Sequence, residues 1–416
     1  MRQYDAYKDS GIPWLGYIPE HWPITSISHV YDVKAGGDAK PELYSEKKDS
    51  LHPYPVLTNT KDFDSVYAYT SQPTCKGNTI TVTGRGEVGN AFYREIPYDA
   101  IIRLLSLSPK SVQNCKYHTY FIDTIIPFTS DSAAIGQLSA NQLRVREICI
   151  PPINEQNKIV AFLDAKTLKI DECICLRERE LQTLNELKQS QIASVVTRGL
   201  NPNVPMKDSG IPWIGQIPAH WKSLYLFQIA KEHFVSNKDI HHQNLLSLSY
   251  GNIVRKDINA TEGLLPSSFD GYQVVSPGNI ILRFTDLQND HKSLRVGLVK
   301  EEGIITSAYV CIEPGDIILP DYCYFMLHSY DIMKVFYGMG GGLRQSLNYQ
   351  GIRKLLLPVP PMEEQREIVK FIESKTRKID SMISSLNAEI ERLKEYKQSL
   401  ISDVVTGQIN VQDEII

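Results

Sequence analysis

Two pairs of duplicated segments constrain the fold of this chain more than any other feature. Lys8–Trp22 reads KDSGIPWLGYIPEHW and Lys207–Trp221 reads KDSGIPWIGQIPAHW, with 12 of the 15 residues identical. We call these two segments the GIPW motifs. They contain all four tryptophans of the chain: Trp14, Trp22, Trp213 and Trp221. Identity of this extent predicts two copies of one structural unit.

The second duplicated pair shows that the repeat covers the whole chain. Pro151–Leu163 reads PPINEQNKIVAFL and Pro360–Ile372 reads PPMEEQREIVKFI, and we call these segments the PP motifs. KTLKID follows the first and KTRKID follows the second. Each copy therefore consists of a GIPW motif, a variable middle and a terminal segment. The predicted boundaries are a first domain over 1–150, a first helix over 151–200, a second domain over 201–359 and a second helix over 360–416.

The two variable middles have diverged but carry the same pattern. Both are rich in β-branched and aromatic residues, with Gly and Pro interruptions that are typical of many short strands. TITVT follows Gly77-Asn78 in the first middle, and IILRF follows Gly278-Asn279 in the second. We therefore expect one mixed α/β fold in both middles.

Each terminal segment is predicted to be one long helix. No proline lies between Pro152 and Pro202, and none follows Pro361. A helix of some forty residues would be about 60 Å long. Apolar residues recur in both segments with the heptad spacing of a coiled coil. The predicted seam consists of Leu163, Ile170, Ile174, Leu181, Leu184, Ile372, Ile379, Ile383, Leu386, Ile390 and Leu393.

The connections predict that the two helices pair antiparallel. The first helix runs into the second domain and the second helix leaves that domain, so both of these helix ends lie near it. Arg177, Lys188, Gln191 and Lys397 interrupt the seam, and polar seam residues commonly fix register. The predicted fold class is α+β: two mixed α/β domains separated by a pair of long antiparallel coiled-coil helices, in a pseudo-twofold tandem repeat. Two amphipathic helices packed on their own domains are the alternative.

Composition limits the possible partners and compartments. The formal net charge of −4 argues against indiscriminate coating of nucleic acid, because Lys and Arg supply most non-specific affinity. No apolar run is long enough to span a membrane, and the N-terminal segment lacks the apolar core of a signal peptide. Seven cysteines without regular spacing favour a reducing compartment. We expect a cytoplasmic protein that has no metal site and no membrane partner.

The sequence offers no catalytic motif. A phosphate-binding G-x-x-x-x-G-K-[ST] loop is missing, as is the Asp/Asn-Pro-Pro-aromatic tetrapeptide of amino-methyltransferases. The glycine-rich runs GRGEVG (84–89) and GMGGG (338–342) lack a lysine and are interpreted as loops or turns. We therefore expect a chain that is not an enzyme by itself and binds no cofactor.

Polar residues near the ends of strands and in glycine-rich loops are the candidate binding residues. In a chain that binds DNA, an arginine among them would pair with guanine through O6 and N7, and a phosphate contact is the equal alternative for each candidate. The candidates are Lys76, Arg85, Arg283, Lys292, Arg295, Arg344 and Gln345. For the tryptophans of the GIPW motifs, anchoring of each domain to the helices is favoured over direct contact with a partner protein.

The chain resembles the specificity subunit of type I restriction-modification enzymes. The resemblance rests on PP-x-x-EQ-x-x-IV-x-F at Pro151 and Pro360, on KT-x-KID, on the VVTRG and VVTGQI helix ends, and on KDSGIPW. It implies two target-recognition domains, each reading one half of a split site in double-stranded DNA, with a spacer set by the helices. It also implies two methyltransferase subunits that use S-adenosylmethionine, and restriction subunits that use ATP and Mg.

Three other functions stay open. The first is a specificity subunit for a fused restriction-methylation enzyme, which differs only in its partner. The second is a stand-alone DNA-binding regulator. The third is a scaffold that does not bind DNA, which the charge balance mildly favours. The full-length double motif outweighs that charge argument.

Overall fold

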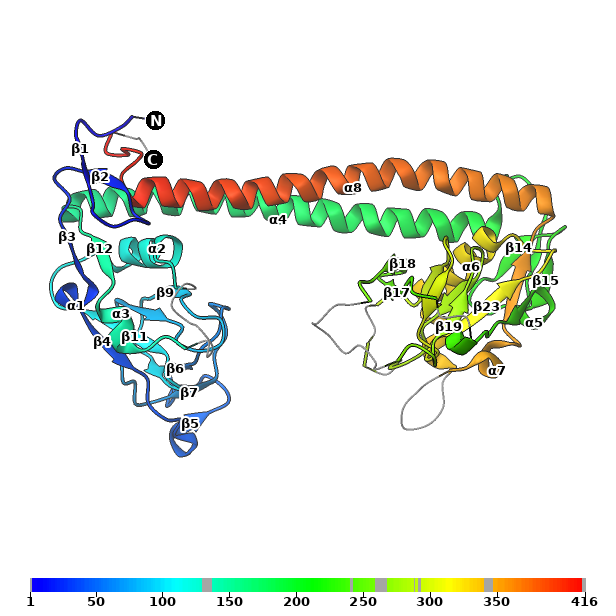
Figure 1. Ribbon diagram of the computed structural model, residues 1–416, viewed down its shortest axis with the longest axis horizontal. Coiled ribbons are helices and arrows are strands. Elements are labelled where there is room, and N and C mark those ends of the chain that lie inside the picture. Colours follow the sequence, from blue (N-terminus) through cyan, green and yellow to red (C-terminus); the bar gives the residue numbers. More distant parts are fainter. Residues whose placement is uncertain are drawn as a thin grey trace. The chain divides into compact units, whose positions relative to one another are not determined.

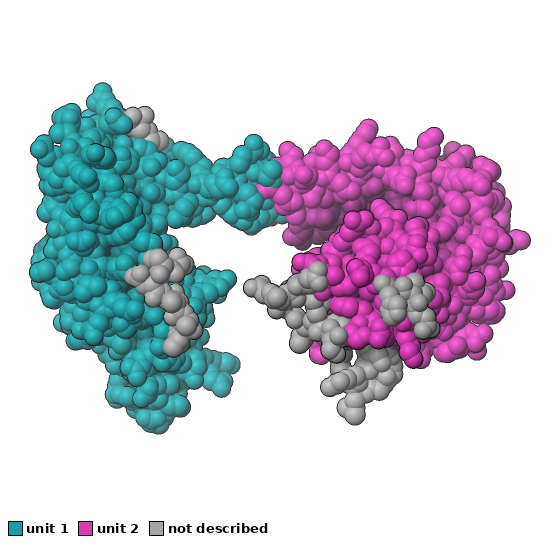
Figure 2. Space-filling model, in the orientation of Figure 1, with its two compact units in different colours: residues 1–178, 388–416 teal, residues 179–387 magenta. Residues whose placement is uncertain are grey.

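The computed structural model describes residues 2–128, 137–239, 242–258, 268–287, 289–290, 293–339 and 347–413. The chain divides into two compact units, with residues 1–178 and 388–416 in unit 1 and residues 179–387 in unit 2 (Figure 2). Two long helices contribute to both units: α4 (Ile153–Arg198, 46 residues) and α8 (Met362–Val405, 44 residues). The predicted helices of forty residues or more are thus confirmed.

Unit 1 contains a mixed α/β domain built on the sheet β4-β11-β8-β9 (Figure 1). Its strands are β1 (Tyr7–Asp9), β2 (Tyr17–Pro19), β3 (Ile24–Ser26), β4 (Tyr31–Ala35), β5 (Tyr44–Ser45), β6 (Tyr54–Leu57), β7 (Ala68–Thr70), β8 (Thr79–Val82), β9 (Ala91–Arg94), β10 (Asp99–Ala100), β11 (Leu105–Pro109) and β12 (Glu147–Cys149). Its short helices are α1 (Ile27–Val30), η1 (Pro41–Leu43), α2 (Cys115–Ile125) and α3 (Ala140–Arg144).

Unit 2 contains the corresponding domain, built on the sheet β16-β23-β20-β21. Its strands are β13 (Met206–Asp208), β14 (Gln216–Pro218), β15 (Lys222–Tyr225), β16 (Ala230–Glu232), β17 (Leu246–Ser249), β18 (Asn252–Arg255), β19 (Gln273–Val275), β20 (Ile280–Leu282), β21 (Val296–Leu298), β22 (Gly303–Ile305), β23 (Val310–Pro314) and β24 (Leu356–Val359). Its short helices are α5 (Leu226–Ile229), η2 (Asn237–Asp239), α6 (Pro320–Ile332), η3 (Val335–Gly338) and α7 (Tyr349–Ile352).

The two domains share the four-stranded sheet, the GIPW hairpin and the helix beside the long helices, but the sheet β10-β6-β7-β5 of unit 1 is replaced in unit 2 by the two-stranded sheets β17-β18 and β19-β22. Each GIPW motif forms an antiparallel hairpin, β1–β2 in unit 1 and β13–β14 in unit 2. The strands after Gly77-Asn78 and Gly278-Asn279 are β8 and β20, which occupy the same place in their sheets. The prediction that both middles share one mixed α/β fold is confirmed.

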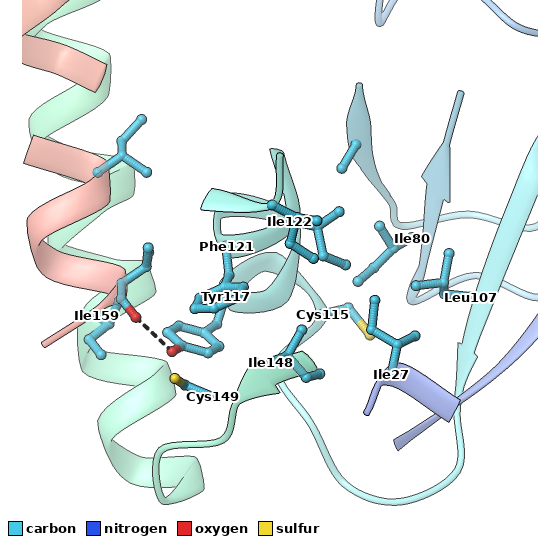
Figure 3. Close-up of a cluster of buried hydrophobic side chains, with 14 of the residues drawn as sticks. Ile27, Ile80, Leu107, Cys115, Tyr117, Phe121, Ile122, Ile148, Cys149 and Ile159 are labelled. Atoms are coloured by element: carbon cyan, nitrogen blue, oxygen red, sulfur yellow. Dashed lines mark hydrogen bonds between the residues drawn. The ribbon is translucent and has the colours of Figure 1, made fainter. Parts of the chain in front are cut away.

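Helix α2 connects the sheet of unit 1 to the long helices. In Figure 3, Ile122 of α2 lies toward Ile80 of β8, and Tyr117 lies toward the long helices. The Tyr117 hydroxyl donates to the carbonyl oxygen of Val405 at 2.9 Å. In unit 2 the Tyr322 hydroxyl of α6 donates to the carbonyl oxygen of Val196 at 3.0 Å. Both acceptors lie in the last turn of a long helix, where carbonyls have no partner within the helix.

The two long helices run antiparallel within each unit. In unit 1, Lys397 Nζ lies 2.7 Å from Asp171 Oδ2, and Arg177 Nε lies 3.0 Å from Glu389 Oε1. Residue numbers therefore decrease along α8 in the direction in which they increase along α4. The predicted seam residues are buried or half-buried. The antiparallel coiled-coil seam of the predicted fold class is therefore confirmed.

Equivalent ion pairs connect the helices in both units. Lys188 Nζ lies 2.6 Å from Asp380 Oδ1 in unit 2, and these residues stand 209 positions from Lys397 and Asp171. All four side chains are partly exposed, so each pair contributes at most about 1 kcal/mol to stability. The pairs form at one register only, which gives the polar interruptions of the seam a structural role.

The GIPW motif and the PP motif together form the junction between domain and helices, which we call the joint. In unit 1, Trp22 is fully buried, its Nε1 donates to Glu155 Oε2 at 3.0 Å, and His21 Nε2 lies 2.8 Å from Glu155 Oε1. In unit 2, Trp221 Nε1 donates to Glu364 Oε2 at 3.0 Å. Both glutamates lie in the first turn of a long helix.

The same joint covers the last turn of the other long helix. A Cβ on Gly407, after α8, would lie 3.0 Å from Trp22, and a Cβ on Gly199, after α4, would lie 3.2 Å from Trp221. Both glycines adopt positive φ, +76° and +75°, which side chains rarely tolerate. Each tryptophan thus packs between the end of one long helix and the start of the other.

The glutamine of the EQ pair bonds to the backbone of the variable domain. Gln156 Oε1 accepts from the Asn114 backbone N–H at 2.9 Å, and Gln365 Oε1 accepts from the Leu319 backbone N–H at 2.8 Å. Both glutamine side chains are buried, so these hydrogen bonds form away from water. The EQ pair therefore holds the GIPW motif through its glutamate and the variable domain through its glutamine.

Two buried histidines predict a loss of stability in mild acid. Burial lowers the pKa of His118 on α2 to about 3, and burial together with the charge of Lys188 lowers the pKa of His328 on α6 to about 4. The unfolded chain binds a proton at each histidine below about pH 6.5, whereas the folded chain does not. Stability should fall with pH from 6.5 toward 5, by up to about 1.4 kcal/mol per pH unit for each histidine.

Unfolding free energies of the wild type and of His118→Gln between pH 7 and 5 check this expectation. The variant should show a flatter pH dependence than the wild type, because one of the two groups no longer titrates. Equal slopes for the two proteins would contradict it.

Candidate nucleic-acid interface

Arg85 lies in the loop after β8, where the backbone passes close to two other segments. A Cβ on Gly84 would lie 2.9 Å from the carbonyl oxygens of Arg103 and Leu138, so only glycine fits there without a shift. Arg85 is exposed and forms an isolated backbone bridge with Gln137. The loop is thereby held in place while the guanidinium stays accessible.

A cavity of about 460 Å³ opens beside Arg85, and Arg103 and Gln137 also line it. With its amide oxygen turned toward Arg85, Gln137 accepts from Nε at 2.8 Å and from Nη2 at 3.0 Å. Asn141 and Gln142 line the cavity as well, but they bond to Arg144 and Ser139 around α3. The two guanidinium groups, with that of Arg85 held by Gln137, are therefore the polar groups of the cavity that can meet base edges, which guanidinium groups recognise.

Arg103 is a site residue that the sequence reasoning missed. It follows β10 in a turn where Ile102 and Arg103 adopt φ of +52° and +64°. Asn59 joins this turn to the Arg85 loop, because its amide donates to the Ile102 carbonyl and its oxygen accepts from Gly84 N–H at 2.7 Å. The available signal was a single charged residue inside the apolar run IIRLL, which alternatively fits a strand.

Lys76 does not lie with this group. It is exposed at the start of β8, whereas Arg85 follows the end of the same strand. Its carbonyl oxygen accepts from Thr79 Oγ1 at 3.2 Å. Lys76 thus stays a predicted DNA contact, separate from the cavity.

The candidates of unit 2 have different surroundings. Arg283 follows β20 and keeps 30% of its side chain exposed, with Nη2 at 3.8 Å from Asp290 Oδ2. It remains a candidate contact. Lys292, Arg344 and Gln345 lie outside the described residues.

Arg295 requires a correction, because its side chain is fully buried. Nη1 donates to the carbonyl oxygens of Arg283 and Thr285 at 3.2 and 2.8 Å, and Nη2 donates to that of Asp286 at 3.2 Å. Nε donates to the Tyr337 hydroxyl at 3.0 Å. These bonds occupy the guanidinium, so Arg295 holds the loop after β20 and does not reach DNA itself.

The four tryptophans divide into two kinds. Trp22 and Trp221 are buried in the joints, where the anchoring hypothesis places them. Trp14 is half-buried beside the core of unit 1, and Trp213 is 39% exposed with its ring edge-on to Tyr330 at 5.5 Å. Trp213 therefore has surface available for a partner, and Trp221 does not.

The described residues show no cluster of metal-ligating side chains. Within these residues, no group of three His, Cys, Asp or Glu side chains is placed to hold a metal ion. Burial raises the pKa of Cys115 to about 11 and of Cys149 to about 12, which keeps both thiols protonated at neutral pH. No helix in the described part of the chain is long and apolar enough to cross a membrane.

Comparison with known proteins identifies the family. The model of the type I restriction modification DNA specificity domain matches residues 19–186 and 295–392. The putative type I specificity subunit S.MpnORF507P of Mycoplasma pneumoniae is 29% identical over 164 residues, which are 39% of this chain and 45% of that protein. The chain thus spans about half the length of this relative.

Two further proteins match over more of the chain. The type I restriction enzyme EcoBI specificity subunit of Escherichia coli is 24% identical over 335 residues, which cover 72% of this chain and 68% of that protein. A chain of a solved structure described as "Structural basis underlying complex assembly and conformational transition of the type I R-M system" aligns with a TM-score of 0.65 and 12% identity, covering 94% of this chain and 99% of that one. This last match shows a shared fold. From the family model, which covers more than half of its residues, the chain belongs to the type I restriction-modification DNA specificity family.

Proposed function

We propose that this chain is the DNA-recognition subunit of a type I restriction-modification enzyme. Each of its two domains reads one half of a split DNA site, and the paired helices set the spacer between the halves. One observation carries the proposal: the two joints repeat the same contacts, whereas the loops after β8 and β20 differ in sequence and in support. Two joints with the same contacts are expected to bind two copies of the same partner protein, whereas loops that differ are expected to read different half-sites.

The long helices offer a surface for those partners. Within each unit, large apolar side chains on these helices face solvent, which is typical of surfaces that another protein covers. In unit 1 they are Leu168, Leu176 and Tyr396, and in unit 2 they are Leu187, Phe371 and Met382. We propose that two methyltransferase subunits dock there and that restriction subunits join the complex through them. The methyltransferase then supplies S-adenosylmethionine chemistry and the restriction subunits use ATP and Mg, while this chain itself is not catalytic.

A base-resolution map of N6-methyladenine tests the proposal. Cells that express this chain with its methyltransferase should show one bipartite methylated motif with a fixed spacer. Cells that lack the chain should lose that motif, and a map without any split site would overturn the proposal. Gel-shift titrations distinguish the alternatives, because a stand-alone regulator would bind its site tightly without methyltransferase and a scaffold would not bind at all.

Arg85 gives a residue-level prediction. Arg85→Ala in the methyltransferase complex should weaken discrimination at one base pair by about 1–3 kcal/mol, because a bidentate arginine–guanine contact is lost. The methylated motif should relax at one position of one half-site and stay unchanged in the other half.

Lys76→Ala is the matched control for Arg85→Ala. We propose that Lys76 contacts a DNA phosphate, which carries no information about the base. This variant should therefore weaken binding uniformly without changing the motif. An unchanged motif for Arg85→Ala would remove Arg85 from the readers and leave Arg103 as the next candidate.

A further inference from the structure

The two units differ at one equivalent place, where the variable domain faces the long helices. In unit 1 polar contacts join α2 and α4 at this place. Lys116 Nζ lies 2.8 Å from Asp164 Oδ2, and the Tyr120 hydroxyl donates to Asp164 Oδ1 at 2.8 Å. The single carboxylate is thus neutralised by a lysine and bonded by a phenol.

In unit 2 the same positions carry two acids. Tyr117 and Tyr322 make the same bond to the end of a long helix, so the preceding residues, Lys116 and Asp321, correspond. Glu373 follows Asp164 by 209 positions, the offset of the two PP motifs. The lysine–aspartate pair of unit 1 is therefore replaced in unit 2 by two acids, Asp321 and Glu373.

A cavity of about 420 Å³ lies at this place in unit 2, lined by Asp321 and Glu373. Neither carboxylate is engaged in an ion pair among the described residues. Lys188 also lines the cavity and is paired with Asp380, Nζ to Oδ1 at 2.6 Å. Lys300 lines the cavity as an exposed residue. With the Lys188–Asp380 pair counted as neutral, the two acids and Lys300 leave one negative charge in excess.

His328 gives an independent sign that a ligand belongs here. Its ring lines the cavity and is 8% exposed, and Nδ1 has no hydrogen-bond partner in the described part of the chain. Burial lowers the pKa of His328 to about 4, so the ring is neutral at pH 7 and offers an acceptor nitrogen. A buried polar atom without a partner costs stability, and a ligand that donates hydrogen bonds removes that cost.

We propose that this cavity receives an arginine side chain of the methyltransferase copy that docks on unit 2. Guanidinium carries five donors and no acceptor, which suits a lining of two carboxylates and a neutral imidazole. Its flat face can also stack on Tyr324, which lines the same cavity. The inference rests on the proposed function for the identity of the partner. It adds that the two methyltransferase copies bind unequal sites, since unit 1 has the Lys116–Asp164 pair where unit 2 has two acids.

Asp321→Lys tests the inference by recreating in unit 2 the lysine of unit 1. The new lysine lines the same cavity as Glu373, so the fold is expected to tolerate it while the cavity gains a positive charge. Titration of the full chain with its methyltransferase, followed by native mass spectrometry, should show two bound copies for the wild type. For the variant, one copy should bind about tenfold or more weakly, and the melting temperature should stay equal or rise.

Asp316→Lys is the matched control. Asp316 is exposed shortly before α6 and does not line the cavity, and its replacement changes the net charge by the same amount. This variant should bind both copies like the wild type. Glu373→Gln, which removes one charge with little change of shape, should weaken one copy and not the other.

Three outcomes overturn the inference. The inference is overturned directly if the Asp321→Lys variant binds both methyltransferase copies as tightly as the wild type does. Equal weakening by Asp321→Lys and Asp316→Lys overturns it as well, because it reveals a general charge effect. If the wild type binds no methyltransferase, the proposed function is overturned, and the source of the arginine is lost with it. The wild-type titration alone gives this result, so it is distinguishable from an effect of a substitution.

Discussion

Replacement of Trp221 by alanine is expected to destabilise unit 2 by about 3–5 kcal/mol, as for other large aromatic side chains removed from cores. Trp221 is fully buried, and its indole fills the space between the last turn of α4 and the first turn of α8. The truncation leaves a cavity there and removes the donor that Glu364 Oε2 accepts from at 3.0 Å. Chemical denaturation of the full chain measures the loss of stability. The loss should appear in the unfolding transition of unit 2 and leave that of unit 1 unchanged.

Trp213→Ala is the control, since it removes the same side chain from the same motif. Trp213 is 39% exposed and contacts Tyr330 with its edge, so its loss should cost about 1 kcal/mol or less. If both variants lost equal stability, the assignment of Trp221 to the joint would be wrong. A large effect of Trp213→Ala on methyltransferase binding alone would instead identify it as a partner contact.

Lengthening both long helices is expected to change the DNA spacer. Four residues inserted after Glu178 in α4 and four after Asn387 in α8 add about one turn, or about 6 Å, to each helix. The insertions fall at the boundary between the units, so the pairs Asp171–Lys397 and Lys188–Asp380 stay intact within their own units. The methylated motif should keep both half-sites and gain at most about two base pairs of spacer.

Insertion into α4 alone is the control for the lengthened helices. It shifts one helix against the other, so the two ion pairs cannot form together at their present register. This variant should lose stability and methylation, whereas the double insertion should keep both. A double insertion with an unchanged spacer would show that the helices do not set the distance.

Sequence patterns predicted the parts of the structure that depend on local periodicity. The long helices and their seam follow from an apolar heptad repeat without proline, and the two matching domains follow from duplication. Even the polar interruptions at Lys188 and Lys397 were visible, because a lysine in an apolar seam needs a partner. The sequence does not identify the partner of either lysine, because Asp380 becomes a neighbour of Lys188, and Asp171 of Lys397, only once the antiparallel register is fixed.

The candidate site was predicted less completely, because exposure depends on tertiary contacts. Arg85 follows a strand-like stretch and Arg295 follows a polar stretch. The sequence therefore does not tell which of the two side chains is exposed. The structure leaves Arg85 accessible and surrounds Arg295 with carbonyls from a loop that precedes it by several residues. Arg103 escaped notice because its turn needs positive φ at two residues without glycine, and Asn59 supports that turn from a distant segment.

The glutamines of the joints have a consequence for how new specificities arise. Gln156 and Gln365 bind backbone N–H groups of the variable domains, which every non-proline residue provides. The framework therefore places few demands on side-chain identity at these contacts, and substitutions can accumulate in a domain without loosening its attachment. Exchange of a whole domain between related genes should likewise be tolerated when the incoming domain keeps this backbone path and the tyrosine that bonds to the end of a long helix. Inheritance of a recognition sequence would then proceed by transplantation of intact domains as readily as by stepwise mutation.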